Sequence, residues 1–127
     1  MGVNNVSRGK YALVTGATSG FGYEFCKKLA ADGFNLVVVA TNAEQLRHKA
    51  ADLTRSFMIE VLPISKDLYK PSAAEEIYAE LKSKNIEVHL LVNDAGQGEH
   101  QPMRTTSHMK TIFTQRNRQI DKSTKLW

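Results

Sequence analysis

The chain has 127 residues and a net charge of +4, and its 42% hydrophobic and 24% charged residues suit one globular domain rather than a two-domain enzyme. The single cysteine, Cys26, excludes an internal disulfide and a multi-cysteine zinc site, and it indicates a reducing compartment. Because the first residues lack an apolar signal core and the longest apolar run, 34–40, cannot cross a bilayer, we expect a cytoplasmic protein with no membrane segment.

Strand and helix patterns alternate from residue 10 onward. Residues 10–16 predict a short buried strand, and residues 20–32 predict a helix that Gly33 can end. The apolar positions that recur on one face of this helix are Phe21, Phe25 and Leu29. Residues 34–40 (FNLVVVA) predict a second strand, which is apolar throughout, as expected where both faces of a sheet are covered.

The same alternation continues to residue 93. Asn42 can cap a second helix, and Gln45 completes a capping box. The inner stripe of this helix is Leu46, Ala50, Leu53 and Phe57. Residues 58–64 predict a third strand. Pro71 suits the first turn of a third helix, whose inward positions are Ala74, Ile77 and Leu81. Residues 86–93 predict a fourth strand.

This alternation requires parallel strands joined by right-handed crossovers. It therefore predicts an α/β fold with a doubly wound sheet of about four strands. Residues 1–100 are predicted to form this domain and residues 101–127 a separate tail.

Residues 15–22 (TGATSGFG) stand between the first strand and the first helix, where a phosphate-binding loop belongs. Gly16 can take the tight turn after the strand. Gly20 and Gly22 lack Cβ atoms, so a pyrophosphate can approach the backbone and the helix can pack closely against the sheet. Thr18 and Ser19 can add hydroxyl donors. The alternative is a glycine-rich turn that serves chain geometry alone.

Three motifs together resemble those of the short-chain dehydrogenase/reductase family over about residues 10–96. The spacing Gly-x-x-x-Gly-x-Gly resembles the family's Thr-Gly-x-x-x-Gly-x-Gly signature. Residues 93–96 (NDAG) are similar to the family's Asn-Asn-Ala-Gly, with Asp94 in place of the second Asn. Asp67 and Leu68 are similar to the acidic–aliphatic pair that contacts the adenine. The resemblance implies a Rossmann-like fold with the strand order 3-2-1-4, and an oxidoreductase that uses NAD(P).

The resemblance also implies a set of cofactor-binding residues. Asp67 and Leu68 would flank the adenine, although a solvated carboxylate at a strand end is the plainer interpretation of Asp67. The phosphates and the adjoining ribose would be held by Gly16, Thr18, Ser19, Gly20, Phe21 and Gly22. The cofactor cleft would be lined by Asn93, Ala95 and Gly96.

The end of the second strand bears on the choice between NAD and NADP. An acid there would bind the ribose 2′-OH of NAD, and an Arg nearby would accommodate the phosphate of NADP. Thr41, in the run Ala40-Thr41-Asn42, offers neither. Because no carboxylate there repels a 2′-phosphate, we lean slightly to NADP.

The family reaction is a hydride transfer in which a Tyr donates a proton, helped by a Lys four residues later and a Ser about 13 residues earlier. The chain holds two Tyr-x-x-x-Lys spacings, which begin at Tyr23 and Tyr78, and Ser65 precedes Tyr78 by 13 residues. Tyr78 would lie on the adenine side of the cleft, away from a nicotinamide, and Tyr23 lies beside the glycine loop without a Ser partner. No tyrosine follows Tyr78. We therefore predict no catalytic residue, and a chain that does not turn over alone.

The last stretch differs from the rest in charge and pattern. Residues 1–96 hold 11 basic and 11 acidic residues, whereas residues 97–127 hold six and two. From residue 101 the apolar periodicity fades, which favours a truncated gene product, or one read in a shifted frame after about residue 100. His100 and His108 lack a third metal ligand, so we expect no metal site.

Three functions stay open at this stage. The first is the cofactor-binding part of a short-chain reductase, and the second is a catalytically silent dinucleotide-binding or partner-binding module. The third is a basic tail that binds nucleic acid, which we do not expect because the tail has few aromatic residues. Strand four would form an exposed sheet edge, so we expect self-association through it.

Overall fold

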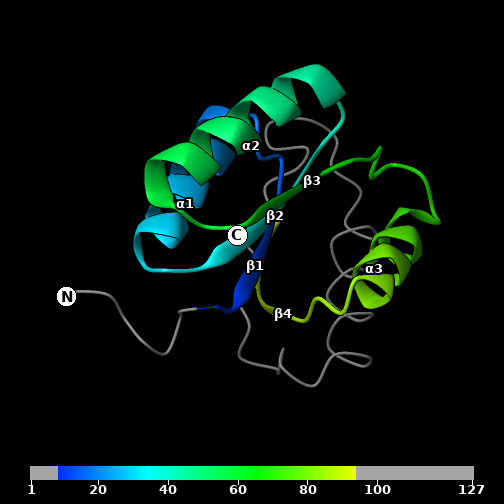
Figure 1. Ribbon diagram of the computed structural model, residues 1–127. Helices are drawn as coiled ribbons and strands as arrows, with labels where there is room; N and C mark the ends of the chain where they lie inside the picture. Colours follow the sequence, from blue (N-terminus) through cyan, green and yellow to red (C-terminus); the bar gives the residue numbers. More distant parts are fainter. Residues whose placement is uncertain (1–8, 94–127) are drawn as a thin grey trace.

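The computed structural model describes residues 9–93 and shows an open sheet with helices on both faces (Figure 1). Its elements in chain order are β1 (Tyr11–Thr15), α1 (Gly20–Ala31), β2 (Asn35–Ala40), α2 (Ala43–Phe57), β3 (Val61–Ser65), α3 (Ala73–Ser83) and β4 (Val88–Asn93). All neighbouring strands are parallel, and their order is β3-β2-β1-β4. The predicted α/β fold and strand order are confirmed.

Each face of the sheet carries its own hydrophobic core. One core lies between the sheet and the helices α1 and α2, and it includes Val14, Val38 and Leu53. The other lies between the sheet and α3, and it includes Leu13, Val37 and Ile77. Because alternate residues of a strand point to opposite faces, the near-continuous apolar runs of β1 and β2 serve both cores.

α1 approaches the sheet through small residues rather than through its aromatic stripe. Its buried positions are Gly22, Cys26 and Ala30. Phe21, Phe25 and Leu29 lie to one side, and Phe21 is 63% exposed. The expectation that these three share a face is correct, but that face is not the inner one, because only small side chains fit where the helix comes this close. Burial raises the pKa of the Cys26 thiol to about 12.

Two predicted boundaries are wrong. α2 is capped as expected, since Asn42 Oδ1 accepts a hydrogen bond of 2.9 Å from the Gln45 N–H. Its last residue is Phe57, and Met58 follows as the C-cap with a left-handed φ of 57°, so the third strand begins only at Val61. α3 begins at Ala73 with Ser72 as its N-cap, so Pro71 precedes the helix instead of lying in its first turn.

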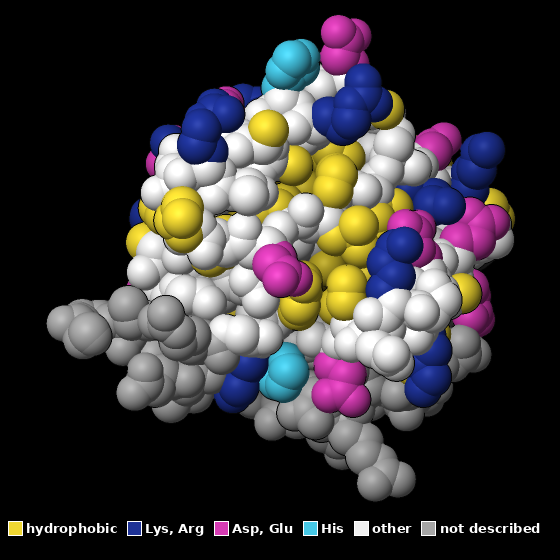
Figure 2. Space-filling model, in the orientation of Figure 1, with side chains coloured by type: hydrophobic (Ala, Val, Ile, Leu, Met, Phe, Trp, Pro, Cys, Tyr) yellow, Lys and Arg dark blue, Asp and Glu magenta, His cyan; other side chains and the backbone are white. Residues whose placement is uncertain are grey.

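The outer strand β3 carries a proline at its centre. Its exposed edge runs between α2 and α3, where hydrophobic surface gathers in Figure 2. Leu36 N–H donates to Glu60 O, and Lys66 N–H donates to Ala40 O. The backbone N–H and C=O groups of the even-numbered residues of β3 therefore point toward β2, and those of the odd-numbered residues point away from it. Pro63 therefore stands at an outward position, where its missing N–H prevents another strand from pairing.

Within residues 9–93, no helix is long and apolar enough to cross a membrane. The same residues include no group of three His, Cys, Asp or Glu side chains that could hold a metal ion.

Candidate dinucleotide-binding site

The glycine loop joins the carboxyl end of β1 to the start of α1. Gly16 has a φ of 64°, a conformation that residues with a side chain rarely adopt, and the Ser19 N–H closes the turn onto Gly16 O at 3.0 Å. The Ala17 N–H donates to Val39 O at 3.2 Å, which ties the loop to β2. The loop is thus fixed at the carboxyl edge of the two central strands, where open α/β sheets bind ligands.

Ser19 shapes this loop through its side chain. Its Oγ donates to Gly16 O at 2.8 Å and accepts from the Gly22 N–H at 3.0 Å, so it caps α1. The sequence assigned this hydroxyl to the phosphates. In the structure its proton is directed at Gly16 O, so Ser19 holds the loop in shape.

The first two N–H groups of α1 are open. No described residue accepts a hydrogen bond from the N–H of Gly20 or Phe21, whereas the Gly22 N–H is satisfied by Ser19. Both lie at the positive end of the helix dipole. Two donors and a partial positive charge at one point make a site for an anion such as a pyrophosphate.

Gly20 and Gly22 lack side chains for different reasons. A Cβ added to Gly22 would lie 2.0 Å from Gly16 O, so this glycine is required by the fold itself. A Cβ added to Gly20 would meet nothing within 4 Å. The protein's own packing does not require glycine at position 20, which leaves the space in front of it for a ligand.

The other predicted contacts lie along the same edge of the sheet. Thr41 directly follows β2, Asp67 follows β3, and Asn93 ends β4 beside Thr15 of β1. Thr18 lies in the loop between Gly16 and Ser19 and is partly buried. Ala95 and Gly96 lie outside the described residues. The structure therefore brings the described candidates to one edge, from β3 across to β4.

The adenine pair is arranged differently from the prediction in one respect. Asp67 is exposed, and its Oδ1 accepts from the Tyr69 N–H at 3.0 Å, which fixes the loop after β3. Leu68 is buried in the core beneath α3. Only 7% of this residue is exposed, so its backbone is the part that it presents at this edge of the sheet.

The two Tyr-x-x-x-Lys pairs lie away from this edge or are already engaged. The Tyr23 ring lies between α1 and α2. Its centre is 4.2 Å from Lys49 Nζ and 5.3 Å from Lys27 Nζ. Burial raises the pKa of Tyr23 and the Asp52 carboxylate adds to the rise, and together they outweigh the lowering effect of the Lys27 charge. Ser65 Oγ donates to Thr41 O at 3.0 Å.

We expect Tyr23→Phe and Tyr78→Phe to leave the dissociation constant of a dinucleotide unchanged within about twofold, because Tyr23 faces α2 and Tyr78 packs against the α3 core. Titration calorimetry of each variant measures this. Loss of a dinucleotide-dependent reduction in either variant would show that a tyrosine here reaches the nicotinamide.

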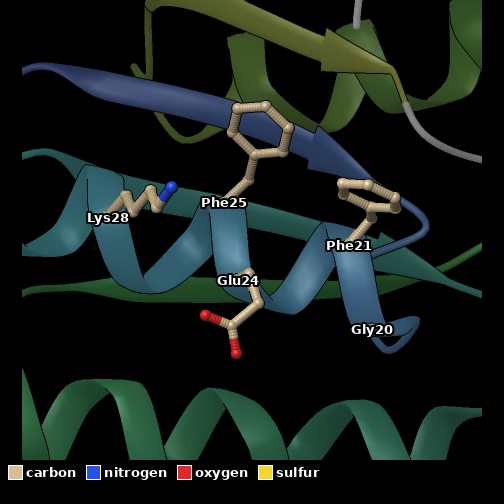
Figure 3. A pocket seen from close by; sticks show the side chains of 5 residues that line it. All are labelled: Gly20, Phe21, Glu24, Phe25 and Lys28. Atoms are coloured by element: carbon tan, nitrogen blue, oxygen red, sulfur yellow. The ribbon is translucent and has the colours of Figure 1, made fainter.

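An open groove of about 570 Å³ begins at the same helix end. It is lined by Gly20, Phe21, Glu24, Phe25 and Lys28. In Figure 3 the two aromatic rings project from one side of α1 and Glu24 from the other. Because α2 packs on the Tyr23 side of α1, the groove faces away from α2. It runs along the helix and shares only its first residues with the glycine loop.

One polar network beside the end of β3 was missed in the sequence. Lys66 Nζ lies 2.9 Å from Glu76 Oε1, and Ser72 Oγ donates to Glu76 Oε2 at 2.8 Å. The i,i+4 spacing of Ser72 and Glu76 was the only local signal. The partner Lys66 comes from another element, so its pairing could not be read from spacing.

Known proteins give this arrangement its context. A family model described as short chain dehydrogenase matches residues 10–116. The chain is 37% identical over 71 residues to the 7beta-hydroxysteroid dehydrogenase of Collinsella aerofaciens, which covers 56% of this chain and 27% of that protein. It is 33% identical over 104 residues to the very-long-chain 3-oxoacyl-CoA reductase of Schizosaccharomyces pombe. This match covers 80% of this chain and 30% of that protein.

Among solved structures, the L-sorbose reductase of Gluconobacter frateurii, complexed with NADPH and L-sorbose, superposes with a TM-score of 0.69. It is 29% identical and covers 76% of this chain and 36% of that one. The chain therefore belongs to the short-chain dehydrogenase family. It spans between 27% and 36% of the length of these three proteins. The family match runs to residue 116, beyond the 10–96 range of the recognised motifs.

Proposed function

We propose that this chain binds a nicotinamide dinucleotide, with the pyrophosphate on the open N–H groups of Gly20 and Phe21. The observation that carries this proposal is the unfilled space at Gly20 directly in front of those donors. The adenosine would extend toward Asp67, and the nicotinamide toward Asn93 at the end of β4. Residues 1–100 would form the dinucleotide-binding domain, with 101–127 as its basic tail.

The same site gives the chain its place in an oxidoreductase reaction. Bound there, the dinucleotide would supply or accept the hydride, and this chain would hold and orient it. No tyrosine follows Tyr78 in the sequence, so we infer that the 127 residues alone do not turn over a substrate. The lean to NADP is supported by the NADPH in the L-sorbose reductase structure and by Thr41, which brings no carboxylate near the ribose. We also place the chain in the cytoplasm.

Gly20→Val tests the proposal by filling the space in front of the donors. We expect the dissociation constants of NADPH and NADH, measured by calorimetry, to rise at least about tenfold. Ala31→Val is the matched control, because it adds the same β-branched side chain at the exposed far end of α1. Unchanged affinity in Gly20→Val would remove the glycine loop from cofactor binding.

We further propose that the chain self-associates through β4, the last strand of the described sheet. Asn35 N–H donates to Lys10 O. The backbone N–H and C=O groups of the even-numbered residues of β1 therefore point toward β2, and those of the odd-numbered residues point toward β4. Leu13 of β1 lies beside Leu91 of β4. In a parallel pair, the backbone groups of Leu13 then bond to residues 90 and 92. The backbone N–H and C=O of Leu91 therefore point away from β1. Unlike β3, this edge has no proline.

A further inference from the structure

Lys66 lies at the point where dinucleotide-binding folds distinguish their cofactors. It directly follows β3, and its N–H donates to Ala40 O, the last residue of β2, at 3.0 Å. Its backbone is therefore beside Thr41, at the strand end where an acid selects the ribose 2′-OH and a cation selects a 2′-phosphate. Thr41 is uncharged, and Lys66 is a charged residue whose backbone this geometry brings beside it.

The charge of Lys66 is already neutralised within the protein. Its Nζ lies 2.9 Å from Glu76 Oε1, and its side chain is only 24% exposed, whereas that of Glu76 is 50% exposed. The second oxygen of Glu76 accepts from Ser72 Oγ at 2.8 Å. The hydrogen bonds from Lys66 and Ser72 lower the pKa of Glu76, with Lys66 and Lys70 adding to the effect through their charge. Glu76 is thus anchored on α3 as a carboxylate.

We propose that Glu76 sets the cofactor preference of this chain by holding the Lys66 ammonium on α3, away from the adenosine ribose. This inference rests on the proposed dinucleotide-binding function. With Glu76 in place, the 2′-position meets uncharged Thr41 and a neutralised lysine, so NADH and NADPH differ little in affinity. Without it, the flexible lysine side chain turns toward the carboxyl edge and pairs with a 2′-phosphate.

Glu76→Gln tests this inference through the ratio of the NADH and NADPH dissociation constants, measured by calorimetry. We expect NADPH to gain about tenfold over NADH, since one charge-assisted contact to the phosphate is added. Glu80→Gln is the matched control, because it removes the same charge one turn further along α3. Ser72→Ala, which removes the anchor of Glu76, should shift the ratio less, in the same direction.

The double change Glu76→Gln with Lys66→Met should restore the wild-type ratio of the NADH and NADPH dissociation constants, because the gain in NADPH affinity comes from Lys66. An unchanged ratio in Glu76→Gln and Ser72→Ala, or an equal shift in Glu80→Gln, would overturn the role of Glu76 while leaving dinucleotide binding intact. A wild-type chain that binds neither cofactor would overturn both the inference and the proposed function.

Discussion

Gly22→Ala is expected to lower the free energy of unfolding by about 3 kcal/mol, the upper end of what an overpacked core position costs. The added Cβ would lie 2.0 Å from the backbone oxygen of Gly16, and backbone cannot rotate out of the way as a side chain can. α1 would have to move off the sheet, and the cap that Ser19 makes to the Gly22 N–H would be lost. Such a loss is a large part of the stability of a small domain.

Gly20→Ala is the matched comparison, two positions earlier in the same helix. Nothing lies within 4 Å of its added Cβ, and alanine favours a helix over glycine, so stability should stay equal or rise by up to about 1 kcal/mol. Urea unfolding followed by circular dichroism measures both variants. Equal destabilisation by the two alanines would contradict the separate roles that we give these glycines.

The second large effect concerns β4, the outer strand of the sheet within residues 9–93. We expect the Leu91 amide to exchange with solvent at least about tenfold more slowly when the protein concentration is raised from micromolar to millimolar, because a second copy pairs with β4. The Val61 amide, at the opposite edge, should show no such dependence, since Pro63 blocks pairing there.

Identical edges that pair across a two-fold axis run antiparallel, so the expected dimer is a continuous sheet with β4 at its centre. The rings of Phe21 and Phe25 project from the side of α1 opposite to Glu24, and we expect this side to face the new neighbour. Light scattering gives the mass of the assembly. A monomer at millimolar concentration, with concentration-independent exchange at Leu91, would contradict the self-association proposal.

The order of the elements could be predicted because its signals are local. Apolar runs, the Asn42 cap and the alternation of strands and helices each depend on a few neighbouring residues, and together they determine a parallel sheet. The start of β3 could not be predicted, because it depends on Met58 taking a left-handed conformation that non-glycine residues seldom adopt. The buried face of α1 could not be predicted from the apolar pattern, because close approach to the sheet selects small side chains such as Cys26.

The candidate site divides in the same way. The glycine loop was visible because its function depends on backbone, and glycine is the residue that exposes backbone. The burial of Leu68 and the pairing of Lys66 with Glu76 depend on how α3 packs, which residue spacing does not encode.

Backbone amide shifts in a two-dimensional NMR titration with NADPH test the central claim most directly, because they report on each N–H separately. We expect the largest shifts at Gly20 and Phe21, smaller shifts at Thr41 and Asp67, and none at Met58 at the opposite end of α2. In the same titration of Gly20→Val, the Phe21 amide should no longer shift, while the spectrum remains that of a folded protein. Saturating shifts elsewhere, with Gly20 and Phe21 unmoved, would contradict the assignment of this helix end as the dinucleotide site.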